Sequence, residues 1–216
     1  WGIGSSEATH VAATQTTVQT KPGTMRVTFN GKRPEWVTAK DMILHLIGTH
    51  GAGGGIGYAI EFAGPAIRDL AMDGRFTICN MTIEFGTKYG TIAPDETTLE
   101  YVKGRDYAPE GKLWDQALEH WRGLPSDADA AFDREIDLDV GAIAPQVTWG
   151  TSPEHVIPVD GTVPDPADEP DPVRRQSLED ALAYQGLEPG AALTDLAVQW
   201  AFIGSCTHGR LGDLRA

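Results

Sequence analysis

Apolar and polar residues follow two different periods along this chain. Short runs in which apolar side chains alternate or cluster predict β-strands, at residues 24–29 and 58–62. Apolar residues at helical spacing, several of them behind a residue that can open a helix, predict helices, at residues 5–13, 38–48, 65–72, 95–102 and 113–121. Short strands mixed with helices predict an α/β fold.

Two segments carry turn or breaker signals. Asn30-Gly31 is well suited to a two-residue hairpin turn, so we expect Trp36-Val37 to lie on the returning strand. Seven of the 14 prolines lie between Pro145 and Pro172. Because proline lacks an amide donor, this stretch predicts an extended connection rather than a central strand or helix.

The last forty residues predict a helix, a strand and a loop. Ser177 begins a capping-box pattern, which predicts a helix through Tyr184. The apolar run 196–203 predicts a buried strand, followed by a Gly-bounded loop and the first turns of a helix from Arg210. Since a strand and part of a helix need partners, and since the chain begins at Trp1, we expect an internal piece of a longer polypeptide.

Charge divides the chain unevenly. The net charge is −14, and residues 126–216 hold 17 acidic and five basic side chains. Such a surface repels phosphate backbones and anionic lipids, which argues against nucleic-acid and membrane partners. The change in charge balance places a domain boundary near residues 125–145. We therefore expect the tail of a preceding α/β domain at 1–24, a compact α/β domain at 25–140, and a Pro-rich connection leading into a further domain at 141–216.

Two cysteines and the lack of a long apolar run predict a reduced, cytoplasmic protein. The glycine-rich run 51–57 invites a phosphate-loop interpretation, but it follows a predicted helix and precedes a predicted strand. The nucleotide fingerprint has the opposite order, so a helix stop and turn is the favoured interpretation.

Residues 77–90 carry the first candidate chemistry. If they form a helix, Asn80 and Glu84 are i, i+4 neighbours on one polar face beside an apolar face. Glu84 could then be solvated or paired with Lys88. Alternatively, the amide and the carboxylate point into a polar cleft, where the carboxylate handles a proton.

Cys206 carries the second candidate chemistry. It lies in a Gly-bounded loop between a predicted strand and a predicted helix start, where amide dipoles favour a thiolate. A thiolate acts as a nucleophile or as a metal ligand, whereas a buried cysteine can be inert. His208 could be a base, a hydrogen-bond donor or a surface residue. The six histidines show no spacing typical of metal ligands.

Several motifs in the same order resemble the aconitase family, and more closely its isopropylmalate isomerase branch. The resemblance covers essentially the whole chain, and its motifs are Ile78-Cys79-Asn80-Met81-Thr82-Ile83-Glu84, Pro145-Gln146-Val147-Thr148-Trp149-Gly150-Thr151 and Phe202-Ile203-Gly204-Ser205-Cys206-Thr207. It implies aconitase-like three-layer α/β/α domains, here a central portion of the large subunit. His208 departs from the family's usual Asn.

The resemblance also implies chemistry. It assigns Cys206 as the first of three cysteine ligands of a [4Fe–4S] cluster, with the other two expected downstream. It assigns Glu84 to the leaving hydroxyl or water and Asn80 to a place beside the cluster. The implied activity is a hydro-lyase of leucine biosynthesis that isomerises isopropylmalate by dehydration and rehydration. A small subunit and a hydroxy dicarboxylate are the implied partners, and we expect neither cluster nor turnover from these 216 residues alone.

Three alternatives stay open at this point. The first is a homoaconitase-type hydro-lyase acting on a related hydroxy acid. The second is an enzyme in which Cys206 is a nucleophile and His208 or Glu84 a base. The third is a non-catalytic folding or assembly module.

Overall fold

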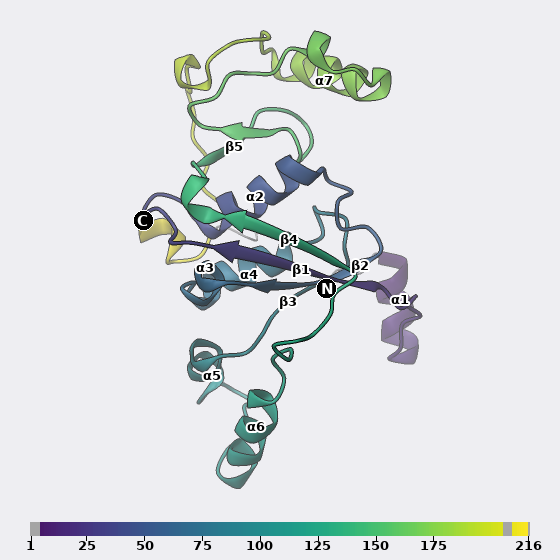
Figure 1. Cartoon of the computed structure of the whole chain (residues 1–216), viewed down its shortest axis with the longest axis vertical. Coiled ribbons are helices and arrows are strands. Elements are labelled where there is room, and N and C mark those ends of the chain that lie inside the picture. Colours follow the sequence, from purple (N-terminus) through teal and green to yellow (C-terminus); the bar gives the residue numbers. More distant parts are fainter. Residues whose placement is uncertain (1–4, 205–208, 216) are drawn as a thin grey trace.

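The computed structural model describes residues 5–204 and 209–215, and at its centre lies a four-stranded parallel sheet (Figure 1). The strands are ordered β3-β2-β1-β4. Their bounds are Gly23–Asn30 for β1, Tyr58–Ala63 for β2, Tyr89–Ile92 for β3 and Arg134–Asp139 for β4. Helices flank this sheet, so the predicted α/β class is confirmed.

The helices and the remaining strands follow the chain in a simple order. The helices are α1 (Ser5–Thr14), α2 (Ala39–His50), α3 (Pro65–Arg68), α4 (Met72–Asn80), α5 (Glu96–Val102), α6 (Lys112–Arg122) and α7 (Pro172–Gln185). Strands β5 (Gln146–Thr148) and β6 (Val156–Pro158) form an antiparallel pair. Single 3₁₀ turns lie at Val140–Ala142, Pro166–Asp168, Leu193–Asp195 and Asp213–Arg215. Among the described helices, none has both the length and the apolar character needed to cross a membrane.

The alternation in β1 decides which face of the sheet is covered. Met25, Val27 and Phe29 are fully buried, while Arg26 and Thr28 between them are half-buried. Successive strand residues point to opposite faces, so the apolar set forms one face. Helices α2, α3 and α4 pack in this core with Ile43, Ile47, Ile67 and Ile78. On the other face Arg26 pairs with Glu135 at 3.0 Å.

Helix α2 begins and ends as its sequence predicts. Thr38 and Asp41 form a reciprocal capping box, and the Asp41 carboxylate also accepts a hydrogen bond from the amide of Gln146 at 2.7 Å. The helix ends at Gly51, whose φ of 81° is the left-handed conformation that favours glycine. The glycine-rich run is therefore a helix stop and a turn into β2, as predicted.

The predicted hairpin at Asn30-Gly31 is wrong. Strand β1 pairs in parallel with β2 on one side and with β4 on the other, so both of its edges are occupied. Trp36 and Val37 therefore have no edge of β1 to pair with. Val37 instead packs in the core, and Trp36 is exposed.

The predicted strand at 196–203 is also absent from the structure. Val198, Trp200 and Phe202 are 77%, 92% and 89% exposed, and no strand is formed there. A strand needs a neighbouring backbone to bond with. Among the described residues no strand pairs with this segment.

Residues 145–195 fold more than the proline count predicts. Strands β5 and β6 and helix α7 enclose a second small core of Trp149, Val163, Ala181 and Leu182. Helix α7 begins behind Asp171, whose carboxylate accepts from the amides of Val173 and Arg174, rather than at Ser177. Pro172 at its first position explains the earlier start.

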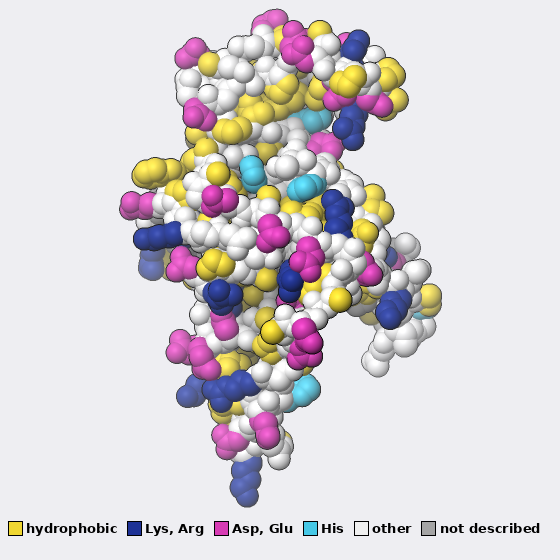
Figure 2. All heavy atoms as spheres, viewed as in Figure 1, with side chains coloured by type: hydrophobic (Ala, Val, Ile, Leu, Met, Phe, Trp, Pro, Cys, Tyr) yellow, Lys and Arg dark blue, Asp and Glu magenta, His cyan; other side chains and the backbone are white. Residues whose placement is uncertain are grey.

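Surface charge is mixed on the face drawn in Figure 2. Acidic side chains are spread among Lys and Arg side chains and are not gathered into one patch. One ion pair between a buried arginine and a half-buried aspartate matters for the site. Arg75 in α4 is 3% exposed and donates to both carboxylate oxygens of Asp95 at 2.6 and 2.7 Å. It also donates to the carbonyls of Leu70 and Arg68, so one side chain joins α3, α4 and the start of α5.

This pair predicts a pH-dependent contribution to stability. The hydrogen bonds from Arg75 hold the pKa of Asp95 below its usual value of 3.8. A lowered pKa in the folded state stabilises the protein above the unfolded pKa, and this stabilisation is lost as pH falls through the folded pKa. The melting temperature of Asp95→Asn should therefore lie below wild type near pH 7, and the gap should narrow below about pH 4.

The exposed Asp129 provides the matched control for that titration. Asp129→Asn should leave the melting temperature unchanged across the same range. A gap between wild type and Asp95→Asn that stays constant down to about pH 2 would show that the carboxylate charge contributes nothing.

Gly54 supports a second prediction. A Cβ at this position would lie 2.6 Å from Phe85 Cζ, whereas one at Gly53 would meet only the flexible end of Ile56 at 3.3 Å. Overpacking of this kind costs about 1–3 kcal/mol. Thermal unfolding should therefore show Gly54→Ala destabilised and Gly53→Ala close to wild type, and equal melting temperatures for the two variants would contradict the packing.

Candidate functional site

Asn80 is the last residue of α4, and a turn over residues 81–86 follows it. The prediction that Asn80 and Glu84 share one continuous helix is therefore wrong. The hydroxyl of Thr82 donates to the carbonyls of Ile78 and Cys79, two acceptors that a continuing helix would use. Such side-chain bonds compete with the helix ladder. The turn then closes at Gly86, where φ is 92°.

Glu84 is half-buried on this turn, and its Oε2 atom is buried. No described residue gives that oxygen a hydrogen bond. A buried polar atom without a partner costs about 1–3 kcal/mol, so natural proteins keep few of them. Asn80 is exposed. The turn thus holds a buried acceptor without a described partner, Glu84 Oε2, and the helix before it ends in the exposed side-chain amide of Asn80.

The glycine-rich loop fixes the position of this turn. Phe85 is fully buried, and its carbonyl accepts a hydrogen bond from the amide of Gly55 at 2.8 Å. The ring of His50 meets the ring of Phe85 edge to face at 6.5 Å. Thr87 donates to the carbonyl of Tyr58 at the start of β2. The sequence shows the glycine-rich run directly, but no local feature of the sequence predicts that Phe85 packs against it.

Cys206 and His208 lie outside the described residues. The segment that follows them is described, and it contacts α4. Arg210 donates to the carbonyl of Asp73 at 2.9 Å and to the hydroxyl of Thr77 at 3.0 Å. The structure therefore brings residues just after the Cys206 motif onto the helix that ends at Asn80.

Cys79, which directly precedes Asn80 in α4, is a half-buried free thiol. Burial raises the pKa of its thiol to about 11, although the positive charge of Arg75 acts in the opposite direction. A thiol with so high a pKa is neutral at physiological pH and is a poor nucleophile. Within the described ranges 5–204 and 209–215, no group of three His, Cys, Asp or Glu could hold a metal ion.

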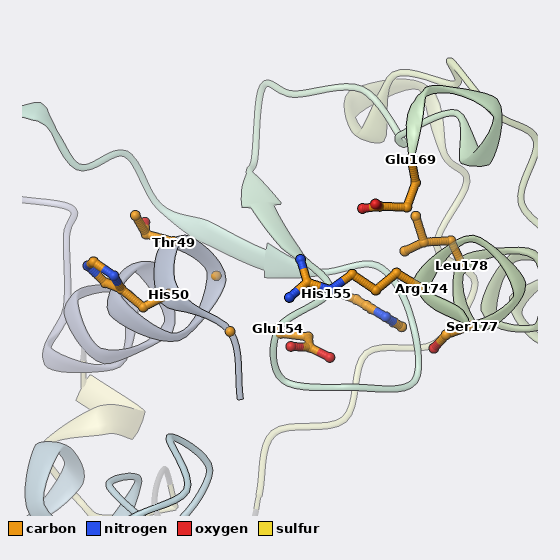
Figure 3. Close-up of a pocket in the computed structure, with 10 residues that line it drawn as sticks. Thr49, His50, Glu154, His155, Glu169, Arg174, Ser177 and Leu178 are labelled. Atoms are coloured by element: carbon orange, nitrogen blue, oxygen red, sulfur yellow. The ribbon is translucent and has the colours of Figure 1, made fainter. Parts of the chain in front are cut away.

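A cavity of about 510 Å³ lies between the end of α2 and the β5–β6 and α7 unit. Figure 3 shows the charged side chains of Glu154, Glu169 and Arg174 around it, together with His50 and His155. Burial lowers the pKa of both histidines, so both rings are neutral near pH 7. No local pattern in the sequence predicts this group, because its members come from segments about a hundred residues apart. The hydrogen bond from the amide of Ala52 to the carboxylate of Glu154 joins these segments. The mixed charges select no single class of ion, and we assign the cavity no role.

The sequence of this chain was compared with protein-family models and with known proteins. The family model described as the aconitase family (aconitate hydratase) matches residues 1–216. The chain belongs to the aconitase family. This aconitase-family chain is also 62% identical over all 216 residues to the 3-isopropylmalate dehydratase large subunit 1 of Bradyrhizobium diazoefficiens. It spans 45% of the length of that relative.

Membership of the aconitase family implies a [4Fe–4S] cluster, and the residues of this chain fit part of such a site. The buried Oε2 of Glu84 is an acceptor without a described hydrogen-bond partner, as expected of an atom that faces a bound cofactor or substrate. The 216 residues contain two cysteines, the half-buried Cys79 and Cys206, which lies outside the described residues.

The raised pKa of Cys79 predicts slow alkylation. A shift from 9.0 to about 11 lowers the thiolate fraction about a hundredfold near pH 8. Peptide mass spectrometry after timed exposure to iodoacetamide should show Cys79 reacting about a hundredfold more slowly in folded protein than in urea. Equal rates in the two states would show that Cys79 is not held in a buried environment.

Proposed function

We propose that this chain is a central part of the large subunit of a 3-isopropylmalate dehydratase. The proposed enzyme is a hydro-lyase that interconverts 2-isopropylmalate and 3-isopropylmalate in leucine biosynthesis. The 62% identity over the whole chain to a large subunit of that name supports this proposal. The observation in the structure that carries it is the buried oxygen of Glu84, which has no described partner.

Glu84 is proposed to exchange a proton with the leaving hydroxyl and with the attacking water, while the proton on the neighbouring carbon is removed and returned by a base that the family resemblance assigns to the small subunit. A carboxylate held by a packed turn needs little reorganisation when it receives or gives a proton. Phe85, anchored on the glycine loop, keeps the neighbouring carboxylate in place. Glu84 Oε2 would pass a proton to the departing hydroxyl and take one back from the attacking water. Asn80 would orient the substrate by donating a hydrogen bond from its side-chain amide.

Cys206 is proposed as one ligand of a [4Fe–4S] cluster, with the remaining ligands supplied by other parts of the complete polypeptide. When bound, such a cluster supplies a Lewis-acidic iron that polarises a hydroxyl and a carboxylate. The part played by the described residues is to hold Glu84 and Asn80 in fixed positions. The packing of Phe85 and the ion pair of Arg75 both serve this purpose.

The partners and the organisation of the chain are parts of the same proposal. The partners are a dehydratase small subunit and a small hydroxy dicarboxylate, and the compartment is a reducing cytoplasm. Residues 25–140 are proposed as the domain that carries Asn80 and Glu84. Residues 1–24 end a preceding domain, and residues 141–216 lead into the domain that carries Cys206.

Glu84→Gln in the complete large subunit, assembled with its small subunit, tests the proposed acid and base. The amide keeps the shape of the side chain and removes the exchangeable proton. The kcat for isopropylmalate should fall about 10²–10⁴-fold, the usual contribution of a general acid or base. The iron content of the variant should equal that of wild type.

Glu100, an exposed residue of α5, is the matched control. Glu100→Gln should retain the wild-type kcat. A Glu84→Gln enzyme within threefold of wild type would remove Glu84 from the mechanism. A wild-type enzyme that binds no iron and does not turn over isopropylmalate would overturn the proposed function as a whole.

A further inference from the structure

Arg210 makes several contacts between the last described segment and helix α4. Its Nη1 atom donates to the carbonyl oxygen of Asp73 at 2.9 Å and to Oγ1 of Thr77 at 3.0 Å. Its Nε atom lies 3.7 Å from Oδ1 of Asp73. The guanidinium carbon stands 6.0 Å from the centre of the Phe76 ring. One side chain thus contacts three residues over little more than one turn of α4.

The acceptors of Arg210 are firmly held. Thr77 is 2% exposed, and its hydroxyl donates to the carbonyl of Asp73 at 3.1 Å. The backbone of the same segment also lies within van der Waals reach of Asp73, because a Cβ at Gly212 would lie 3.4 Å from the Asp73 carboxylate. Arginine presents its donors in a rigid fork, so binding to two fixed acceptors defines the orientation of the chain that carries it.

The contact between Arg210 and α4 links two distant parts of the sequence, and each of them carries a residue of the proposed site. Arg210 and Thr77 are 133 positions apart. Thr77 precedes Asn80 by one helical turn, and Arg210 follows Cys206 by four residues. In Figure 1 the C-terminal segment lies beside α4, in agreement with these bonds.

We propose that Arg210 is a positioning residue that fixes the chain just after Cys206 to helix α4. This inference rests on the proposed function, since it gives Cys206 and Asn80 a common support. Arg210 touches neither substrate nor cluster in this account. It acts by limiting how often the segment after Cys206 leaves α4.

The test compares Arg210→Gln with wild type in the complete large subunit, first without metal. Alkylation of Cys206 by iodoacetamide is followed by peptide mass spectrometry, with Cys79 in the same chain as the internal reference. Loss of a charge-assisted hydrogen bond should increase the fraction of molecules in which the segment is detached from α4. The rate of Cys206 alkylation relative to that of Cys79 should then rise about tenfold. After anaerobic reconstitution, iron release to a chelator should accelerate in the same proportion.

Three further variants separate positioning from a general loss of stability. Arg215→Gln changes an exposed arginine of the same segment and should label like wild type. Arg210→Lys keeps the charge and should restore part of the protection. Thr77→Val should raise labelling of Cys206, and combining it with Arg210→Gln should add little because both remove the same bond.

The outcomes distinguish this inference from the proposed function. Wild-type labelling of Cys206 in Arg210→Gln would overturn the positioning role, as would faster labelling of Cys79 and Cys206 together. If the wild-type subunit holds no iron, the proposed function fails, while the labelling ratio in the metal-free protein still decides the role of Arg210.

Discussion

Phe85 packs directly against the backbone of Gly54 and Gly55, and the position of the candidate site depends on this contact. Only residues without a Cβ allow the ring to come so close. The contact joins the loop before β2 to the turn before β3, two connections at the amino ends of neighbouring parallel strands. Because Glu84 precedes Phe85, the turn holds this side chain half-buried, with its Oε2 atom shielded from water.

The sheet and the helices extend this constraint to the other residues of the proposed site. Helix α4 is held by the core through Ile78 and by the Arg75 ion pair with Asp95. It ends at Asn80, and its preceding turn receives Arg210. A helix fixed at both ends can support groups from distant parts of the sequence.

Sequence patterns predicted most elements whose stability is local. The helix start at Thr38, the helix start at Pro65 and the alternation of β1 depend on neighbouring residues, and the sequence predicts all three. The false hairpin at Asn30 and the continuous helix through Glu84 failed because tertiary contacts outweigh local preference. Neither the parallel partners of β1 nor the glycine pocket for Phe85 has a local signal. Roles for Glu84, Asn80 and Cys206 came from resemblance, and they stay proposals.

The most direct test is an anaerobic crystal structure of the complete large subunit reconstituted with iron and sulfide. The account predicts that Glu84 Oε2 lies within hydrogen-bond reach, about 2.6–3.2 Å, of a water or substrate oxygen beside the cluster. It also predicts that the turn over residues 81–86 keeps its place on the glycine loop. A structure in which Oε2 is instead paired with another side chain of the polypeptide, remote from any cluster, would contradict the central claim.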